Sequence, residues 1–480
     1  MFDVSREEIT GGPLSRALFY VAAPLVVQQY VIVLQQVVDA FWLGRVSEEA
    51  VAAVGLVAPV LGLLTLGNHV ALTGSQVLVA QHAGAEEDGA ARRAAFHAVV
   101  VALAFNLVAL ALAYAFAADA LALFDPGETV VRLGALYLVV VLAGMLFGGM
   151  SDAIEGAFIG WGDSRAALVI NVAAVAVNVA LDPFLVVGWG IQGFTGYGVL
   201  GAALGTASGY VVGFAMAVAL ATTEFTGFTY TRDALKLRLS SLRDVLEIGV
   251  PKAGQEGGRQ TARLLMVAIV SGVGGSAGLA AYTVGMRIST LAFVPAIAVG
   301  GAVASVVGQN VGADKPARAT RATWLAAGAT TIGLTVIGVV QFAIPGLIAD
   351  VFAPQLDGDA LTYTIAYLQI LAVGYWTFGL IYPVQGGFNG AGRTDVSMVT
   401  TMLQYWCVRL PIAAVGAYAV VVTVPVYAAF WAITLSNVAG ALGVAAYFHY
   451  STDRGLLERA AATASTDGDA ADAAEADAAS

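Results

Sequence analysis

The chain has 480 residues, of which 59% are hydrophobic and only 11% are charged, and its mean hydropathy is +0.81. A soluble protein carries about 25% charged residues, so this composition predicts a helical protein that crosses a membrane many times. The net charge is −11, with three lysines against nineteen arginines. This balance argues against nucleic acid as a partner and suits the salty cytoplasm of a halophilic organism.

Twelve apolar segments are long enough to cross the roughly 30 Å of a bilayer's hydrocarbon core. They lie near residues 14–43, 50–80, 94–118, 132–160, 165–189, 198–222, 243–272, 278–307, 319–348, 361–390, 395–422 and 424–449. We therefore expect an all-α polytopic membrane protein with twelve transmembrane helices in two lobes of six.

Positive charge predicts how these segments are oriented. The N-terminus, the loops after even-numbered segments and the C-terminus hold fifteen Lys and Arg residues. The loops after odd-numbered segments hold two, Arg45 and Arg132. By the positive-inside rule, both termini should be cytoplasmic in a multi-pass protein of the cell (plasma) membrane.

Four regions follow from this pattern. Residues 1–222 would form the N-lobe and residues 243–450 the C-lobe. Between them, residues 223–242 carry charges at helical spacing, which predicts a cytoplasmic amphipathic helix that links the lobes. Residues 451–480 are expected to be a disordered acidic cytoplasmic tail, because the stretch after Ala460 has five acids, no bases and few large apolar side chains.

The two halves also repeat one another. "VAQHAGAEEDGAARRAAFH" from Val79 matches "VGQNVGADKPARATRATW" from Val307, and "GAFIGWGDSR" from Gly156 matches "GGFNGAGRTD" from Gly386. These pairs and Pro24 with Pro251 are offset by 227 to 230 residues, so they mark one internal duplication. Because six is even, both halves share an orientation, and a substrate would bind in the cleft between them.

Polar residues gather at one depth of the first lobe. Asp39 is the only charge between Arg16 and Arg45, and Asp182 is the only charge from Asn171 to Val187. A charge at the centre of such a helix costs about 2.5–3.5 kcal/mol on insertion scales. Asn178 lies one turn before Asp182, and Thr206 lies near the outer end of the next segment. Counted from the outer helix ends, all four side chains should meet in the outer half of the N-lobe.

Such a set of oxygen ligands suits Na⁺ or H⁺, and we predict that Asp39, Asn178, Asp182 and Thr206 bind the coupling ion. No other cofactor is expected. Pro183 lacks a backbone N–H and so frees the carbonyl of Val179, which predicts a helix that bends with the charge of Asp182. The alternative that each carboxylate merely joins two helices through hydrogen bonds stays open.

Three motifs carry a resemblance to a known family: "NVALDPFLVVGWG" from Asn178, "VVDAFWLG" in the first segment, and "GAFIGWGDSR". They resemble MATE (multidrug and toxic compound extrusion) transporters, most closely the archaeal and DinF-like branch. The resemblance implies that Asp39, Asn178, Asp182 and Thr206 form the cation or proton site. It also implies cation-coupled export of amphipathic, often cationic, organic compounds. From the repeat we expect the two lobes to rock about the cleft between them, and we expect a monomer among membrane lipids that is not an enzyme.

One position departs from another branch of this family, which has a glutamate where this chain has Arg259. We expect Lys252, Glu256, Arg259 and Arg263 to form a ladder of ion pairs along one helix. The possible cleft-lining residues are Gln35, Glu155, Arg263 and Arg409. If the arginines face the cleft, they would favour an anionic or zwitterionic substrate over a cationic one.

Two other functions remain as alternatives. A flippase for lipids or lipid-linked oligosaccharides, from the wider MOP superfamily, would share two lobes and arginines in the cleft. A remote alternative is an intramembrane aspartyl protease, because Gly160–Asp163 reads Gly-Trp-Gly-Asp. Asp163 lies beside Arg165 at a helix end, which favours a turn motif instead.

Overall fold

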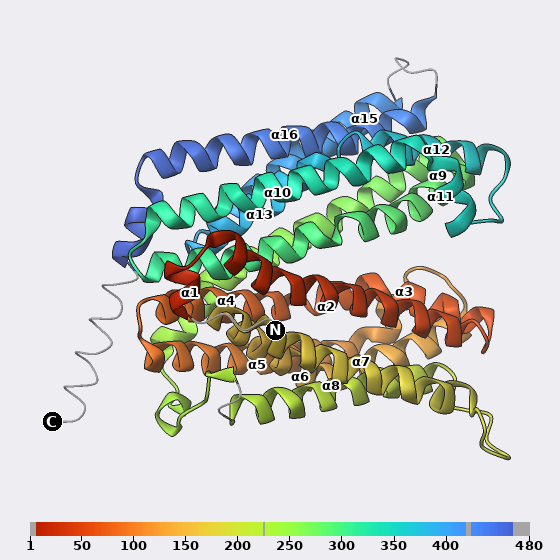
Figure 1. The fold of residues 1–480 in the computed structure, drawn as a ribbon. Helices are drawn as coiled ribbons and strands as arrows, with labels where there is room; N and C mark the ends of the chain where they lie inside the picture. The colour runs from red at the N-terminus through yellow and green to blue at the C-terminus, as the bar shows by residue number, and fades with distance from the viewer. Residues whose placement is uncertain (1–5, 224–225, 419–423, 464–480) are drawn as a thin grey trace.

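The computed structural model describes residues 6–223, 226–418 and 424–463, and its regular secondary structure within these ranges is helical throughout (Figure 1). The helices are α1 (Arg6–Gly11), α2 (Leu14–Leu43), α3 (Glu48–Leu64), α4 (Leu66–Gly84), α5 (Asp88–Ala122), α6 (Glu128–Trp161), α7 (Ser164–Val187), α8 (Val199–Ala221), η2 (Arg232–Leu235), α9 (Leu239–Gly312), α10 (Pro316–Ala343), α11 (Pro345–Phe352), α12 (Gly358–Ala372), α13 (Tyr375–Gly390), α14 (Thr394–Met402), η3 (Leu403–Arg409), α15 (Leu410–Tyr418) and α16 (Pro425–Asp453). This confirms the predicted all-helical class.

The helices form two layers that lie one on the other (Figure 1). One layer holds α2 to α8, and the other holds α9, α10, α12, α13, α15 and α16. α9 packs against α10, α12 and α13 of its own layer, and also against α2 and α4 of the first layer. The long helix α9 therefore makes much of the contact between the two halves of the chain.

Each half has an apolar core of its own. In the first half, Leu121, Leu138 and Leu142 are fully buried together, and in the second half Tyr367, Tyr375 and Phe430 are. A further cluster joins the halves at the end of the molecule where α1 lies, with Val21 of α2 packed among residues such as Val306 of α9. The outer surface is also apolar, since large side chains such as Leu112 and Ile332 are exposed there. Helices that face lipid require such a surface.

Eight of the described helices are long and apolar enough to span a membrane, and the number rises to ten if each of two bent pairs is one span. The bent pairs are α3 with α4, at 46°, and α12 with α13, at 51°. α9 alone covers two of the predicted segments, because its 74 residues contain a break at Gly275 (φ 57°, ψ −152°). Only glycine adopts that backbone conformation readily. The count of twelve spans stays a prediction.

The linker between the halves differs from the expected amphipathic helix. Within the described part of residues 223–242, the only helix that precedes α9 is the single turn η2, and α9 begins at Leu239. The charged residues that follow, such as Arg243, belong to the first turns of α9. The backbone N–H of Arg238 donates to Nε2 of His97 at 2.8 Å. This bond attaches the linker to α5. Most of the described linker is therefore non-helical, unlike the amphipathic helix that was expected.

The prediction of a disordered tail is wrong for its first part. α16 continues to Asp453, and residues 456–463 are also helical. Leu456 and Leu457 in this helix are buried, with Leu457 only 1% exposed, in the cluster that joins the two halves. The apolar residues between the charges therefore anchor the segment. The rest of the predicted tail, residues 464–480, lies outside the described residues.

Candidate cation site and central cleft

Glycines in α8 allow this helix to approach α7 closely. A Cβ atom on Gly205 would lie 2.5 Å from Oδ1 of Asp182, and one on Gly209 would lie 2.7 Å from the carbonyl oxygen of Ala174. Both separations are too short for a real side chain. The sequence "GAALGTASG" in α8 thus brings its backbone, and the hydroxyl of Thr206, directly beside Asp182.

Asn178 links the polar side chains that the sequence predicted to meet. With its amide nitrogen turned towards α2, it donates to Oδ1 of Asp39 at 3.0 Å, and its oxygen accepts from the backbone N–H of Thr206 at 3.0 Å. In the opposite amide orientation, the nitrogen faces Oδ1 of Asp182 at 3.4 Å and Oγ1 of Thr206 at 3.5 Å. Gln35 lies beside this nitrogen, with its Nε2 3.1 Å away. Helices α2, α7 and α8 therefore meet at Asn178.

The two carboxyl groups are direct neighbours, since Asp39 and Asp182 are within hydrogen-bonding reach of each other. Asp182 and Asn178 are each 1% exposed, whereas Asp39 is partly exposed. Oδ2 of Asp182 is buried and has no hydrogen-bond partner among the described residues. A buried carboxylate oxygen without a donor is costly, and a bound proton or cation would satisfy it.

The donor set fits a monovalent ion better than a transition metal. It offers two carboxylates, one amide and one hydroxyl, all of them hard oxygen ligands. Among the residues that the structure describes, no group of three or more His, Cys, Asp or Glu side chains could hold a metal ion. Asp39, Asn178, Asp182 and Thr206 would hold Na⁺, or the two carboxyls would share a proton.

Pro183 follows the site without interrupting its helix. α7 runs through Pro183 to Val187 and ends at Gly188 in the left-handed conformation. The N–H of Trp189 donates to the carbonyl of Pro183 at 3.0 Å, which closes the helix end. The predicted bend that varies with the charge of Asp182 stays a prediction.

A small cavity of about 60 Å³ lies next to this site inside the first half of the chain. Gln35 of α2, Thr206 of α8, and Asp152 and Glu155 of α6 line it. The sequence reasoning did not single out Asp152, although it lies one helical turn before Glu155 in the same apolar segment. It also missed Asn171, a further lining residue, which precedes Asn178 by two turns.

A larger cavity of about 630 Å³ lies between the two halves of the chain, and we refer to it as the cleft. Residues from α2, α4, α6, α7, α9 and α13 line it. Glu155 and Arg263 are among them, as predicted, whereas Gln35 lines the small cavity and not the cleft. Asp152 lines both spaces. Glu155 is held by Gln28, whose Nε2 donates at 2.9 Å, and by Ser151, whose Oγ donates at 3.1 Å. The α6 carboxylates thus stand between the cleft and the candidate cation site.

Arg409 does not line this cleft, which corrects the prediction that it could. It ends the π-helix η3 and is 6% exposed. Its Nε donates to Oγ of Ser436 at 2.9 Å, and its Nη2 donates to Oδ1 of Asn437 at 2.6 Å. The guanidinium also lies over the Tyr405 ring, 3.8 Å from its centroid. Arg409 is therefore enclosed within the second half of the chain.

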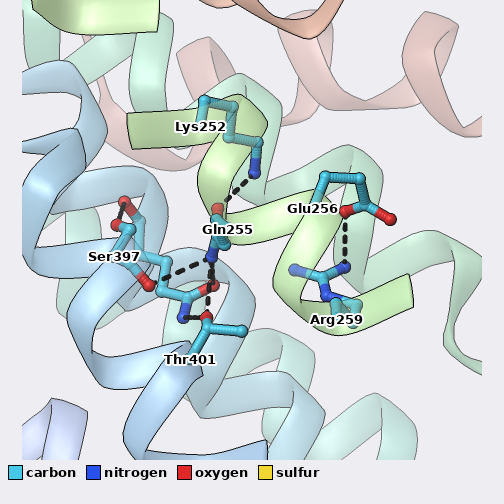
Figure 2. Close-up of polar contacts among 7 residues, drawn as sticks. Lys252, Gln255, Glu256, Arg259, Ser397 and Thr401 are labelled. Carbon is cyan, nitrogen blue, oxygen red and sulfur yellow. Dashed lines mark hydrogen bonds and ion pairs between the residues drawn. The ribbon is translucent and has the colours of Figure 1, made fainter. Parts of the chain in front are cut away.

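The predicted ladder of ion pairs in α9 exists in part (Figure 2). Nη1 of Arg259 lies 3.3 Å from Oε2 of Glu256, as expected for neighbours on one helix face. Lys252 instead donates from Nζ to Oε1 of Gln255 at 2.8 Å. Gln255 in turn donates from Nε2 to Oγ1 of Thr401 at 2.8 Å and is fully buried. This bond ties the start of α9 to α14.

The repeated sequence motifs meet each other across the two halves. Nε2 of Gln81 donates to the carbonyl of Gly390 at 3.0 Å, and Nε2 of Gln309 donates to the carbonyl of Gly160 at 2.8 Å. A Cβ atom on Gly84 would overlap the carbonyl oxygen of Gln309, and one on Gly312 would overlap that of Gln81. We call these six residues the clasp. It closes the cleft at the end of the molecule where α1 lies.

The Gly-Trp-Gly-Asp motif of the protease alternative is a helix start. Asp163 is the N-cap of α7, and its side chain accepts from the backbone N–H groups of Arg165 and Ala166. Its Oδ1 also lies 3.2 Å from Nε of Arg165. Gly162 before it has a φ of 102°, which a glycine tolerates and most residues do not. The motif serves a turn and not a catalytic centre.

Two helical halves around a cleft, with the polar site enclosed in one half, define a membrane transporter. The comparisons with known proteins agree with this class. The MatE family profile matches residues 24–184 and 260–415, which is more than half of the chain and falls once on each half. The chain belongs to the MatE family, and is therefore a membrane transporter and not an enzyme.

Relatives and solved structures show the same family. A probable multidrug resistance protein NorM of Thermotoga maritima is 24% identical over 84% of this chain and 85% of its own length. Another from Burkholderia pseudomallei is 28% identical over 81% of this chain and 83% of its own. A MOP superfamily transporter from Pyrococcus furiosus shares the fold with a TM-score of 0.86 at 21% identity, over 95% of this chain and 99% of that one. An outward-facing multidrug resistance MATE family transporter does so with a TM-score of 0.87 at 20% identity, over the same shares of the two chains.

Proposed function

We propose that this chain is an antiporter that exports amphipathic organic compounds in exchange for H⁺, Na⁺ or both. Relatives named as multidrug resistance proteins support the export of drugs. The observation that carries the coupling is the neighbouring pair Asp39 and Asp182, of which Asp182 is buried and has an oxygen that lacks a partner among the described residues. Proteins keep charges at such depth where they bind ions or protons.

The small cavity gives this pair a way to influence the cleft. The α6 residues Asp152 and Glu155 line both spaces. When a cation neutralises Asp39 and Asp182, the field on the α6 carboxylates weakens and the packing of α2, α7 and α8 relaxes. The cation and the substrate should therefore oppose each other's binding, and this is the requirement for exchange.

Alternating access would come from the movement of the two lobes against each other. The clasp and the shared apolar cluster close the end where α1 lies. With both termini in the cytoplasm, as the positive-inside rule predicts, this arrangement would be open to the outside. The structural similarity to a transporter solved in an outward-facing conformation supports that orientation.

Efflux from proteoliposomes under separately imposed Na⁺ and pH gradients tests the proposal. Asp39→Asn and Asp182→Asn should each reduce gradient-driven efflux of an amphipathic dye at least about a hundredfold, since an amide cannot release a proton and holds a cation weakly. Asp453→Asn serves as the matched control, because this carboxylate is exposed at the end of α16.

Normal gradient-driven efflux by Asp182→Asn would refute the coupling role. If the wild-type chain moves dye at the same rate with and without either gradient, the antiport mechanism is wrong. In that case a lipid flippase, assayed by the movement of a labelled lipid between leaflets, becomes the better proposal.

A further inference from the structure

The two walls of the cleft carry opposite charges. On the first-half wall, α6 presents Asp152 and Glu155. On the facing wall, α9 presents the cations Lys252, Arg259 and Arg263 together with the single anion Glu256. With all these groups ionised, one wall is doubly negative and the other doubly positive. His69 of α4, the remaining titratable side chain apart from tyrosine along this lining, lies in the first half.

Most of these charges already have partners inside the protein. Glu256 is paired with Arg259, and Lys252 is bound to Gln255 (Figure 2). Glu155 accepts from Gln28 and Ser151. Among the described residues, Asp152 and Arg263 line the cleft with no hydrogen bond or ion pair within the protein. Each wall therefore keeps one charge free for a ligand.

The uncharged part of the lining combines apolar and aromatic side chains with amides and hydroxyls, such as those of Gln29, Asn68 and Thr290. Leu72, Met145 and Ile297 line the cleft, and so do Phe293 and Tyr382, whose rings stack with their centroids 6.5 Å apart. A volume of about 630 Å³ lies within the range of pockets that hold drug-sized molecules. The cleft thus offers apolar and aromatic contacts, mixed with amides and hydroxyls, between an anion on one side and a cation on the other.

We infer that the cleft selects zwitterionic amphiphiles, with the ligand's amine facing Asp152 and its carboxylate facing Arg263. This inference rests on the proposed export function and narrows its substrate class. A ligand with both charges satisfies both walls, whereas a ligand with only a positive charge leaves Arg263 facing it without a compensating anion. The apolar body of the ligand packs on Phe293 and Tyr382.

Binding of two dyes that differ in one charge tests this inference. Rhodamine B carries a delocalised cation and a carboxylate, and its ethyl ester keeps the cation but loses the anion. Their dissociation constants are measured by fluorescence anisotropy with the full chain in lipid nanodiscs, without any ion gradient. We expect the wild-type chain to bind rhodamine B about tenfold more tightly than the ester, as for one additional charge pair.

Three variants assign the preference to residues. Arg263→Gln should weaken the binding of rhodamine B about tenfold, leave the ester unchanged, and so remove the preference; Arg263→Lys should restore it. Asp152→Asn should weaken both dyes. Arg454→Gln is the control, because this arginine is exposed beyond α16.

Three outcomes would overturn the inference: equal binding of both dyes by the wild-type chain, an equal effect of Arg263→Gln on both, or binding of neither. These results do not depend on ion coupling. A preserved preference for rhodamine B together with transport that ignores Na⁺ and pH gradients would refute the proposed antiport and leave this inference standing.

Discussion

The two halves of this transporter share one plan but enclose opposite charges. With the offset of 228 residues that relates Gln81 to Gln309, Asp182-Pro183 of α7 corresponds to Leu410-Pro411 of α15. The same offset relates Thr206 of α8 to Thr434 of α16. The first half has the carboxylates Asp39 and Asp182 in this region. The second half has a leucine in place of Asp182, and Arg409 comes one residue before that leucine.

The difference decides which half can respond to an ion. The carboxyls of Asp39 and Asp182 lose their negative charge when they bind a proton, and Na⁺ neutralises it. Arg409 keeps its charge at any accessible pH, and Ser436, Asn437 and the Tyr405 ring hold it in place. We therefore expect the second half to act as a fixed scaffold and the first half to act as the ion sensor.

A buried asparagine in each half gives the largest expected contrast. Asn178→Ala removes the amide that connects Asp39 with α8, so the apparent affinity for the coupling cation should fall at least about tenfold, equivalent to about 1.4 kcal/mol. Asn437→Ala removes the oxygen that accepts from both Arg409 and Gln404. It should cost about 2–3 kcal/mol of stability and leave the cation dependence unchanged.

Efflux measured against Na⁺ and H⁺ concentration, together with thermal unfolding, separates the two effects. A larger change in cation dependence for Asn437→Ala than for Asn178→Ala would contradict the division into sensor and scaffold.

Substitutions in the clasp should affect both halves equally, unlike those of the two asparagines, because the two halves make equivalent contacts there. Gly84→Ala and Gly312→Ala each place a methyl group against a backbone carbonyl of the other half. Each should destabilise the closed end by about 1–3 kcal/mol and by a similar amount. Distances between spin labels on the two halves, measured by electron paramagnetic resonance, should increase at that end for both variants.

Gly328→Ala is the control for these two variants, since a Cβ atom there has no neighbour within 4 Å. An increased distance in only one of the two clasp variants would show that the two contacts do not act as equals.

The two prolines should give the smallest contrast. Pro183→Ala supplies an N–H to the carbonyl of Val179 and should stabilise a straight α7 by about 0.5–1.5 kcal/mol, so turnover should slow between about twofold and tenfold. Pro411 follows the π-helix η3, which already departs from the α-helical bonding pattern. Pro411→Ala should therefore change turnover little. Initial efflux rates at saturating dye measure both, and equal rates for Pro183→Ala and the wild type would place the conformational switch elsewhere.

Counting residues from the helix ends was enough to predict that the side chains of the candidate cation site lie near one another. Asp39, Asn178, Asp182 and Thr206 lie on regular helices, so their depth follows from the rise per residue. Asp152 and Asn171 were missed because the depth argument looked for partners of Asp39 and Asp182 only in the outer half of each segment, and these two residues lie in the inner half. The repeat was also readable, since it depends on sequence alone.

The surroundings of Arg409 could not be predicted in the same way. Residues 403–409 form a π-helix, whose wider turn rotates the following side chains relative to an α-helix. A helical face drawn with 3.6 residues per turn therefore misplaces Arg409. The predictions for the linker and the tail were wrong for another reason. Charge patterning shows whether a segment is polar, but it does not show which neighbour, such as His97, will bind it.

The clasp also bears on the origin of the chain. Gln81 reaches Gly390 while Gln309 reaches Gly160, so each half offers the other the same donor and the same acceptor. A contact of this kind is isologous, as in a two-fold symmetric homodimer. Two identical copies of one such half would pair through this contact without a linker, and any substitution would alter both contacts at once. Fusion of two such copies into one chain would remove that constraint, so that one half can hold carboxylates where the other holds an arginine.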